Sequence, residues 1–235
     1  MNITSFNILA DVFIDFNNPE IYYPTIDKKM LKMKNRFNTL IKYIKGDIIM
    51  LQEVTPYIRS KLISLFKTKY IVLPLSTHIS NTETTGNLTL IKKNKFKTIN
   101  YNTLYINDNA ISITSTDDTD IYNIHLNDIS NEVRIKELKY IISTFNKTRK
   151  IIIGGDFNSD NKKLHNLLKD FKMNIQPKST YLCELPMIDY IYVYGFRKTI
   201  GFIHNTINTI TSQNCYQNTI ALYGSDHHPV YLNVI

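Results

Sequence analysis

Hydrophobic residues make up 43% of the 235-residue chain and charged residues 20%, which are the proportions of a globular protein and exclude a disordered or fibrous one. The length suffices to bury one large core, so we expect a single domain over residues 1–235, acting as a monomer. The formal net charge of +8 at pH 7 favours polyanionic partners, with nucleic acid first among them, because clustered lysine and arginine side chains attract phosphates.

The two cysteines, Cys183 and Cys215, lack CxxC spacing and are too few for a disulfide framework, which indicates a reducing compartment. Residues 1–5 lack the basic and apolar regions of a signal peptide. No stretch approaches the roughly 18 apolar residues that span a bilayer. We therefore expect a cytoplasmic or nuclear protein without stable membrane insertion.

The first predicted element is a strand over residues 3–9. Apolar residues at helical spacing from Met30 to Ile44 then predict one helix, which Gly46 ends. The stretches at 17–25 and 205–218 have the composition of loops, and neither separates two cores. The helix is expected to cover a sheet.

Residues 47–54 predict a strand buried on both faces, because residues 48–51 are all apolar. Thr55 and Pro56 have the residue types of a helix cap and a first helical position, and a second helix should follow them to Phe66. Further short strands are expected at 70–75, 87–92, 110–115 and 120–126.

The last third of the chain repeats a strand-and-helix pattern. A helix is expected over 135–145, a strand at 151–153 that leaves through Gly154 and Gly155, and a helix over 164–171. Late strands are expected at 188–194 and 229–234. Strands outnumber helices, which are spread along the chain, so two sheets packed face to face with helices outside are favoured.

Several predicted strands end in residues that carry chemistry, and a rigid scaffold presents functional groups at such positions. These residues are Asn7, Glu53, His125, Asp156, Asn158, Asp189 and the pair Asp226 and His227. Glycine, aspartate and asparagine would also suit a simple turn at 154–158. Asp189 is harder to explain structurally, because a carboxylate in an apolar strand needs a partner if it is buried. The other histidines are expected to be structural: His78, His165, His204 and His228.

In their order along the chain, these segments resemble the endonuclease/exonuclease/phosphatase superfamily, which includes DNase I, apurinic endonucleases, deadenylases and tyrosyl-DNA phosphodiesterases. The segments that carry the resemblance are SFNI (5–8), LQEV (51–54), HL (125–126), GDFN (155–158), IDYI (188–191) and SDHHP (225–229). The resemblance implies an α/β fold: a four-layer α/β sandwich with two packed, mainly antiparallel β-sheets flanked by helices. It places the active site at the strand ends of one edge.

The same resemblance implies a Mg²⁺-dependent phosphodiesterase or nuclease, with Mn²⁺ as a possible substitute. Glu53 would bind the metal, with Asn7 and Asp226 close by. Mg²⁺ usually takes only one or two protein carboxylates and completes its shell with water and substrate phosphate.

The remaining candidates would act on the phosphate and the attacking water. Asp156 would orient or deprotonate the water, and Asn158 would hold it or a phosphate oxygen. Asp189 would pair with His227 and favour its cationic form, while His125 would donate a further hydrogen bond to phosphate. Metal and donors can stabilise direct displacement by water, so no covalent intermediate is needed.

The substrate stays open at this level. Residues 5–11 look like the deadenylase and 2′-phosphodiesterase branch, whereas residues 51–57 and the short chain look more like tyrosyl-DNA phosphodiesterase. Apurinic endonucleases fit less well, because their tryptophan-containing motifs cannot occur in a chain without Trp. Sphingomyelinase and phosphoinositide phosphatase relatives share the catalytic set. A non-catalytic nucleic-acid-binding module would normally have lost part of it.

Among these alternatives we favour RNA or DNA as the substrate, in single strands or at ends. Lysine-rich stretches at 28–34, 92–97 and 147–150 are expected to line a groove that leads to Glu53 and His227. Tyrosine and phenylalanine side chains, of which the chain has 16 and 11, would stack on unpaired bases.

Overall fold

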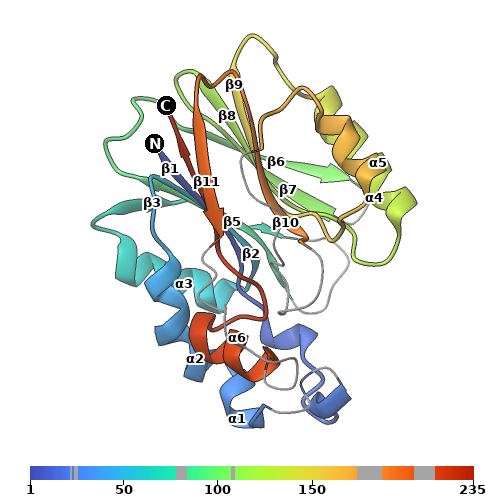
Figure 1. Ribbon diagram of the computed structural model, residues 1–235. Helices are drawn as coiled ribbons and strands as arrows, with labels where there is room; N and C mark the ends of the chain where they lie inside the picture. The colour runs from blue at the N-terminus through green and yellow to red at the C-terminus, as the bar shows by residue number, and fades with distance from the viewer. Residues whose placement is uncertain (22, 24–25, 78–83, 107–108, 174–186, 204–214) are drawn as a thin grey trace.

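The computed structural model describes residues 1–21, 23, 26–77, 84–106, 109–173, 187–203 and 215–235. Two β-sheets pack face to face, and helices cover the outer face of each sheet (Figure 1). The four-layer α/β sandwich expected from the sequence is therefore confirmed.

The first sheet has seven strands in the order β11-β12-β1-β2-β5-β3, with β4 paired to β5. Its strands are β1 (Asn2–Asn7), β2 (Ile48–Val54), β3 (Tyr70–Val72), β4 (Ser76–Thr77), β5 (Gly86–Lys92), β11 (Thr199–Ile203) and β12 (Val230–Val234). β1 and β2 run parallel, and the other pairings described in this sheet are antiparallel.

The second sheet has five strands in the order β10-β9-β8-β7-β6. They are β6 (Asn100–Ile106), β7 (Asn109–Ser115), β8 (Thr119–His125), β9 (Lys150–Asp156) and β10 (Asp189–Tyr194). Here β8 and β9 are the parallel pair, and the neighbouring pairings are antiparallel. Each sheet thus has one parallel pair near its centre, and the sheets are mainly antiparallel as expected.

The helices form the two outer layers. The α-helices are α1 (Lys28–Leu31), α2 (Met33–Leu40), α3 (Pro56–Phe66), α4 (Asn131–Ser143), α5 (Lys162–His165) and α6 (Cys215–Tyr223). Short 3-10 helices are η1 (Asp11–Phe13), η2 (Pro19–Ile21), η3 (Ile41–Tyr43) and η4 (Asn166–Leu168). Figure 1 places α2, α3 and α6 beside the first sheet and α4 and α5 beside the second. Among the described residues, no helix combines the length and the apolar character needed to cross a membrane.

Strand β2, in the middle of the first sheet, is buried on both faces, which accounts for its uninterrupted apolar run. Ile48 and Met50 belong to the core between the sheets, whereas Ile49 and Leu51 pack against the helices outside. Each of these side chains is fully buried. Burial of one such side chain contributes about 1.5–3 kcal/mol, so both faces of the strand stabilise the fold.

Buried polar side chains join the two sheets close to the ends of their central strands. Asn123 of β8 donates from Nδ2 to the carbonyl oxygens of Leu51 (3.2 Å) and Leu88 (3.1 Å). Its Oδ1 accepts a hydrogen bond from Nε2 of Gln52 at 2.7 Å. An unpaired buried polar group is unfavourable, so these hydrogen bonds favour the observed placement of the two sheets.

The helix expected from Met30 to Ile44 is not continuous. Lys32 has extended backbone, with φ −65° and ψ 128°, and separates α1 from α2. The carboxylate of Asp11 accepts hydrogen bonds from the backbone N–H of Met33 at 2.8 and 3.1 Å, so a residue from outside the helix caps α2. The helical spacing of apolar residues does not reveal such an interruption, because it comes from a long-range contact.

Other elements differ from the sequence-based expectation. Strands β4, β6 and β11 and helix α6 are not among the predicted elements. No residue of β6 is buried, because this strand lies at the edge of the second sheet, and α6 begins inside the stretch 205–218, whose composition predicts a loop. Residues 205–214 lie outside the described part. The strand expected at 151–153 continues through both glycines, and α5 with η4 is shorter than the helix expected over 164–171.

Replacing Gly155 by alanine should lower the free energy of unfolding by about 3 kcal/mol or more. Gly155 has φ +149°, and an added Cβ would lie 1.8 Å from the carbonyl oxygen of Ile124 in the neighbouring strand. Gly154→Ala is the matched control, because its Cβ would meet the flexible end of Met50 at 2.4 Å, and that side chain can move. Urea unfolding measures both variants, and equal losses would contradict the prediction.

Candidate active site

The two parallel strand pairs deliver site residues to one edge of the sandwich. β1 and β2 end together, with Asn7 opposite Gln52, and Glu53 follows directly. β8 and β9 also end together, with His125 opposite Asp156. Because the two sheets are packed face to face, these two strand ends lie beside each other, as the contact between Asn7 and Asp156 demonstrates.

The antiparallel neighbours bring the remaining residues to the same edge. β10 begins where β9 ends, so Asp189 lies opposite Asp156. β12 runs antiparallel to β1, and the segment just before it therefore carries Asp226 and His227 to the end of β1. The structure thus brings together residues that are widely separated in sequence.

Glu53 is held by two donors from the β1 end. Nδ2 of Asn7 donates to Oε1 at 2.7 Å, and the backbone N–H of Ala10 donates to Oε2 at 2.8 Å. Glu53 itself has φ 59°, at the point where the register between β2 and β5 shifts. A non-glycine residue in this region costs about 1–3 kcal/mol, and a bulge re-aims a side chain, so the local strain directs Glu53 into the site.

Asp156 lies at the centre of the cluster. Its Oδ2 accepts a hydrogen bond from Nδ2 of Asn7 at 3.0 Å and lies 3.7 Å from Nε2 of both His125 and His227. Its Oδ1 accepts from the backbone N–H of Asn158 at 2.7 Å. The Asn158 side chain donates to Leu126 O at 2.9 Å, which joins the ends of β8 and β9.

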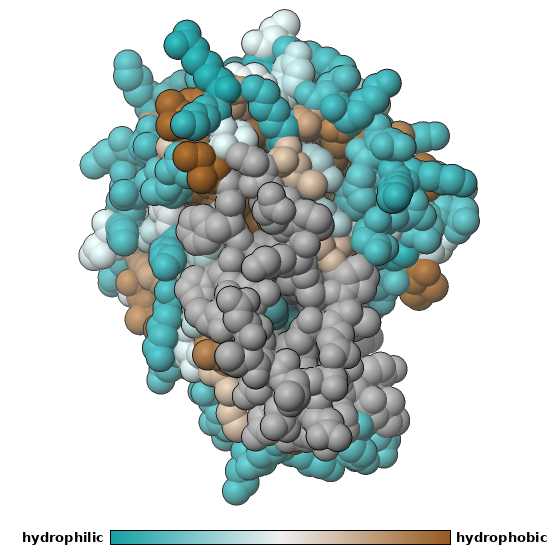
Figure 2. All heavy atoms as spheres, in the orientation of Figure 1, coloured by the Kyte–Doolittle hydropathy of each residue, from teal (hydrophilic) through white to brown (hydrophobic). Residues whose placement is uncertain are grey.

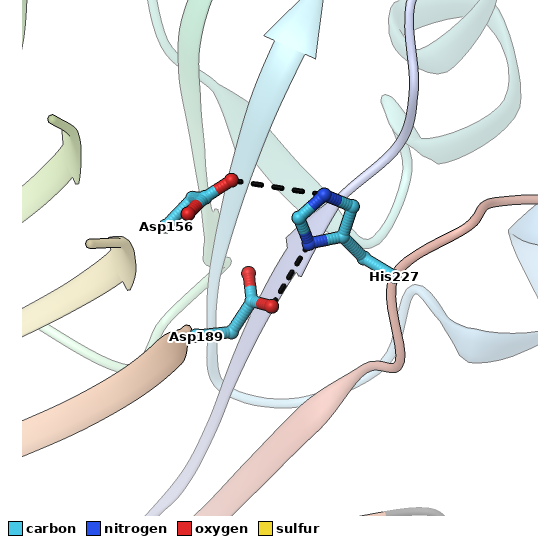
Figure 3. Close-up of side chains that lie close together, drawn as sticks. All are labelled: Asp156, Asp189 and His227. Carbon is cyan, nitrogen blue, oxygen red and sulfur yellow. Dashed lines mark hydrogen bonds and ion pairs between the residues drawn. The ribbon is translucent and has the colours of Figure 1, made fainter. Parts of the chain in front are cut away.

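His227 lies between carboxylates (Figure 3). Its Nδ1 is 2.9 Å from Oδ2 of Asp189, and its Nε2 faces Asp156 on the other side of the ring (Figure 3). Oδ1 of Asp226 lies 4.0 Å from the same Nε2. The partner that a carboxylate in an apolar strand requires is therefore His227, as the sequence predicts for Asp189.

The charges around His227 favour its protonated form. Burial alone would lower the pKa of His227, but Asp189 and Asp156, followed by Asp226, outweigh burial and raise it well above its ordinary value. Both ring nitrogens then carry protons and face acceptors. An imidazolium can stabilise negative charge that develops on a neighbouring phosphate.

Glu53 and Asp226 have the properties of metal ligands. Burial raises the pKa of Glu53, and the charge of Asp226 raises it further, while His125, His227 and the Asn7 hydrogen bond lower it. Two buried carboxylates that repel each other are stabilised by a cation, and hard oxygen donors suit Mg²⁺ or Mn²⁺. The amide oxygen of Asn7 is a further oxygen donor of this kind. Glu53, Asp226 and Asn7 therefore fit a divalent metal ion.

A second group of residues with metal-ligand atoms lies close by. One ligand atom each from Asp156, Asp189 and His227 lie within 4.8 Å of one another. A histidine nitrogen must be deprotonated to bind a metal, whereas here both nitrogens of His227 face carboxylates and the raised pKa favours the cation. These three residues therefore fit an ion-paired imidazolium better than a metal site.

Two further side chains that the sequence reasoning does not single out support the site. Tyr23 donates from its hydroxyl to Oδ2 of Asp226 at 2.9 Å, although the two residues are 203 positions apart. Ser225 donates from Oγ to the carbonyl oxygen of Asn7 at 2.7 Å and accepts from the backbone N–H of His227 at 3.2 Å. Ser225 lies within the SDHHP segment, which is a sequence signal, but nothing local identifies Tyr23.

Helix α4 anchors the chain that follows His125. Glu137 accepts hydrogen bonds from Asn109 Nδ2 at 3.2 Å and from the backbone N–H of Asn127 at 2.9 Å. Asn109 Nδ2 also donates to the carbonyl oxygen of His125 at 2.6 Å. Glu137 is almost fully buried, and burial raises its pKa. The sequence signal for Glu137 is a carboxylate on the helix face that also carries the buried residues Leu138 and Ile141.

The other histidines have structural surroundings. His165 lies 2.7 Å from the hydroxyl of Tyr192 and 3.1 Å from the carbonyl oxygen of Ser159. The ring of His228 packs against Tyr223, with 4.9 Å between centroids. His78 and His204 lie outside the described residues.

The Asp189 and His227 pair makes the stability of the metal-free protein depend on pH. Because the folded-state pKa of His227 is raised above the ordinary 6.5, its contribution is fully present below that pH and is lost as the pH rises through the folded-state pKa. Asp189→Asn should therefore cost about 3–5 kcal/mol of unfolding free energy at pH 6, and this difference should shrink at higher pH. Urea unfolding in EDTA from pH 6 to 10 measures it, and a constant difference would exclude a cationic His227.

Solved structures share the fold. A conserved protein of unknown function from Enterococcus faecalis V583 matches with a TM-score of 0.72 and 16% sequence identity, covering 100% of this chain and 99% of that chain. A mannosyl-6-phosphatase from Bacteroides thetaiotaomicron matches with a TM-score of 0.69 and 11% identity, covering 100% and 99%. Truncated TDP2 from Caenorhabditis elegans matches with a TM-score of 0.61 and 16% identity, covering 100% and 96%. At these identities the likeness shows the fold alone.

The sequence itself matches a family model. Comparison with curated proteins gave no significant match. In contrast, the model of the endonuclease/exonuclease/phosphatase family matches residues 4–227, a span that contains every candidate site residue. The chain therefore belongs to the endonuclease/exonuclease/phosphatase family.

Proposed function

We propose that the protein is a divalent-metal-dependent phosphodiester hydrolase that acts on nucleic acid. The observation that carries the proposal is the continuous chain of contacts from Glu53 through Asn7 and Asp156 to His227 and Asp189. This series of contacts links Glu53, a carboxylate suited to a metal, with the buried imidazolium of His227. The metal ion that Glu53 would hold and the His227 imidazolium are both positive. Both would stabilise phosphoryl transfer, because negative charge builds up on the phosphate oxygens.

The metal belongs at Glu53, with Asn7 and Asp226 as further ligands. Mg²⁺ is the proposed ion and Mn²⁺ a substitute, since both prefer oxygen donors. When bound, the ion supplies Lewis-acid stabilisation of the phosphate charge. Tyr23 holds one oxygen of Asp226, and Ala10 holds one oxygen of Glu53, so both carboxylates are oriented before the ion binds.

The remaining residues act on the water and the phosphate. Asp156 orients the attacking water and takes its proton as the water oxygen bonds to phosphorus and the leaving oxygen departs. The buried His227, held by Asp189, donates to a phosphate oxygen, and so does His125, whose Nε2 lies as close to Asp156 Oδ2 as that of His227. The Asn158 backbone N–H donates to Asp156 and fixes it, and the Asn158 side chain, which also donates to Leu126 O, would hold the water or a phosphate oxygen.

A cavity beside Glu53 supports nucleic acid as the substrate. It has a volume of about 380 Å³ and borders Ala10 and Thr55. Lys32, Lys34 and the exposed ring of Tyr57 line it, together with Asp11, whose carboxylate is paired with Arg36. Two ammonium groups with an aromatic ring form a surface suited to phosphates and a stacked base.

The three lysine-rich stretches do not form one groove. Residues 28–34 supply the lysines beside Glu53, but Lys92 pairs with Asp47, which precedes β2 and lies at the opposite end from Glu53. Likewise Lys150 begins β9 and pairs with Asp118, far from Asp156. The proposal therefore rests on the first stretch alone.

Other substrates within the family are alternative outcomes of the tests. The sequence around Glu53 is similar to tyrosyl-DNA phosphodiesterases, so a 5′-tyrosyl end is the second candidate. Figure 2 shows a face that is mainly hydrophilic outside the grey residues, with only small hydrophobic patches, which suits a charged polymer better than a lipid surface.

Glu53→Gln should lower kcat on bis-p-nitrophenyl phosphate by about 10²-fold or more, because a principal transition-state stabiliser is lost. EDTA should abolish the activity of the wild type, and Mg²⁺ or Mn²⁺ should restore it. Glu132→Gln is the control, since Glu132 is exposed at the start of α4. Wild-type activity that survives EDTA would contradict the metal requirement.

Lys32→Glu with Lys34→Glu should weaken binding of single-stranded oligonucleotides irrespective of sequence, because phosphate contacts do not read bases. Removing two such contacts should reduce the slope of log affinity against log salt by about 1.4. Tyr57→Ala should cost about 1–3 kcal/mol if the ring stacks on a base. Lys136→Glu with Lys139→Glu on α4, which makes the same charge change at exposed sites elsewhere, is the control.

Fluorescence anisotropy across a salt series measures these affinities, and a turnover panel of RNA, DNA, 5′-tyrosyl DNA and sphingomyelin vesicles compares the substrates. Salt-insensitive oligonucleotide binding together with equal turnover of sphingomyelin would reject nucleic acid in favour of the lipid branch. Turnover confined to 5′-tyrosyl DNA would favour the second candidate.

A further inference from the structure

One arginine is buried on the apolar face of α2. Arg36 lies at helical spacing with Met33, Phe37 and Leu40, which are buried as well. Its side chain is only 1% exposed. Its five N–H groups donate to Leu31 O, Ile8 O, Gly224 O, Leu9 O and Asp11 Oδ1. Every donor of the guanidinium is therefore used, and Asp11 supplies a negative charge.

Three of the acceptors, Ile8 O, Leu9 O and Gly224 O, lie within two residues of the proposed metal ligands Asn7 and Asp226. Nη1 donates to Ile8 O at 2.9 Å, just after Asn7, and to Gly224 O at 2.7 Å, two residues before Asp226. One nitrogen thus bridges the β1 end and the segment before β12. Because the guanidinium is planar and rigid, it fixes the distance between these two carbonyl groups.

The contacts to the first segment hold a strained conformation. Leu9 has φ 53°, which a residue with a side chain adopts only when the surroundings require it. Arg36 Nη2 donates to Leu9 O, while Leu9 N donates to Oδ1 of Asn7 at 3.0 Å. This turn presents the backbone N–H of Ala10 to Glu53. Arg36 therefore contacts the same turn that supplies Glu53 with this donor.

The second segment packs directly against α2. Gly224 has φ +74°, and a Cβ added there would lie 2.7 Å from the carbonyl oxygen of Arg36. Gly224 N donates to Ile220 O at 2.8 Å and so ends α6. Burial lowers the pKa of Arg36, whereas the charges of Asp11 and Asp226 raise it, so the guanidinium also interacts with a proposed metal ligand through space.

We propose that Arg36 is a positioning residue that sets the separation of Glu53 and Asp226 and thereby the affinity of the metal site. The proposal rests on the proposed function of these two carboxylates. It differs from a purely structural role, because a buried arginine that only stabilised α2 would leave metal affinity unchanged in a folded variant. Groups that orient metal ligands typically change metal affinity 10- to 100-fold when removed.

The test is Mn²⁺ binding to the substrate-free protein, measured from the electron paramagnetic resonance signal of free Mn²⁺. Arg36→Lys keeps the charge but loses the planar set of five donors. We expect it to bind Mn²⁺ about 10- to 100-fold more weakly. In turnover of a single-stranded oligonucleotide at a fixed Mn²⁺ concentration, kcat should fall while KM changes little, because Arg36 is buried away from the substrate.

Arg149→Lys is the matched control. Arg149 pairs with Asp120 through Nε at 3.0 Å and donates to Thr116 O, so the substitution also breaks an arginine and carboxylate pair. Asp120 lies near the start of β8, roughly 17 Å from His125 at about 3.3 Å per residue. Arg149→Lys should lower the melting temperature without changing Mn²⁺ affinity. Arg36→Lys that folds and binds Mn²⁺ like the wild type would overturn the proposal.

Two further variants separate the possible failures. Glu53→Gln should lose Mn²⁺ binding, and if it does not, the proposed metal site itself is wrong. If Arg36→Lys does not fold, Asp11→Asn takes its place, because it weakens the hold on Arg36 while leaving an oxygen to cap α2. About tenfold weaker Mn²⁺ binding by Asp11→Asn would support the proposal, and unchanged binding would overturn it.

Discussion

Repulsion among buried carboxylates is the constraint on which the rest of this structure depends. Four of them lie buried at one edge of the sandwich: Glu53, Asp156, Asp189 and Asp226. Like charges interact more strongly in a protein interior than in water, so each must be compensated locally. The imidazolium of His227 compensates Asp189 and Asp156, and Asn7 donates to both Glu53 and Asp156. The charge that remains at Glu53 and Asp226 is what a divalent cation would neutralise.

The geometry of the sheets makes this concentration of charge possible. One parallel pair in each sheet ends at the same edge, and an antiparallel neighbour of each pair begins there. Gly154 lets Met50 of the facing sheet approach closely, and Asn123 pairs with Gln52 beside Glu53. Non-glycine residues with positive φ gather at this edge as well, among them Glu53 and Asn158. The rigid sandwich thus supports strained turns that aim polar groups at one point.

The fold and the candidate active site do not by themselves select a substrate. Solved structures with this fold include proteins described as a TDP2 and as a mannosyl-6-phosphatase, so the fold is shared by proteins with different names and descriptions. In this chain the features that we propose to select the substrate lie outside the carboxylate cluster, in the cavity whose lining includes Lys32, Lys34 and Tyr57. Nucleic acid as substrate, the single domain, the monomeric state and the cellular location stay predictions.

The sequence by itself determined the features that depend on neighbouring residues: the buried strand at 48–51, the cap at Thr55 and the order of the family segments. Such features are local, because periodicity and capping involve residues a few positions apart. Only the tertiary structure decided that Asp11 would interrupt the helix expected from Met30 to Ile44 and that Arg36 would join the end of β1 to the segment before β12. An arginine on an apolar helix face signals a buried partner, but its acceptors become neighbours only when distant strand ends meet in the folded protein.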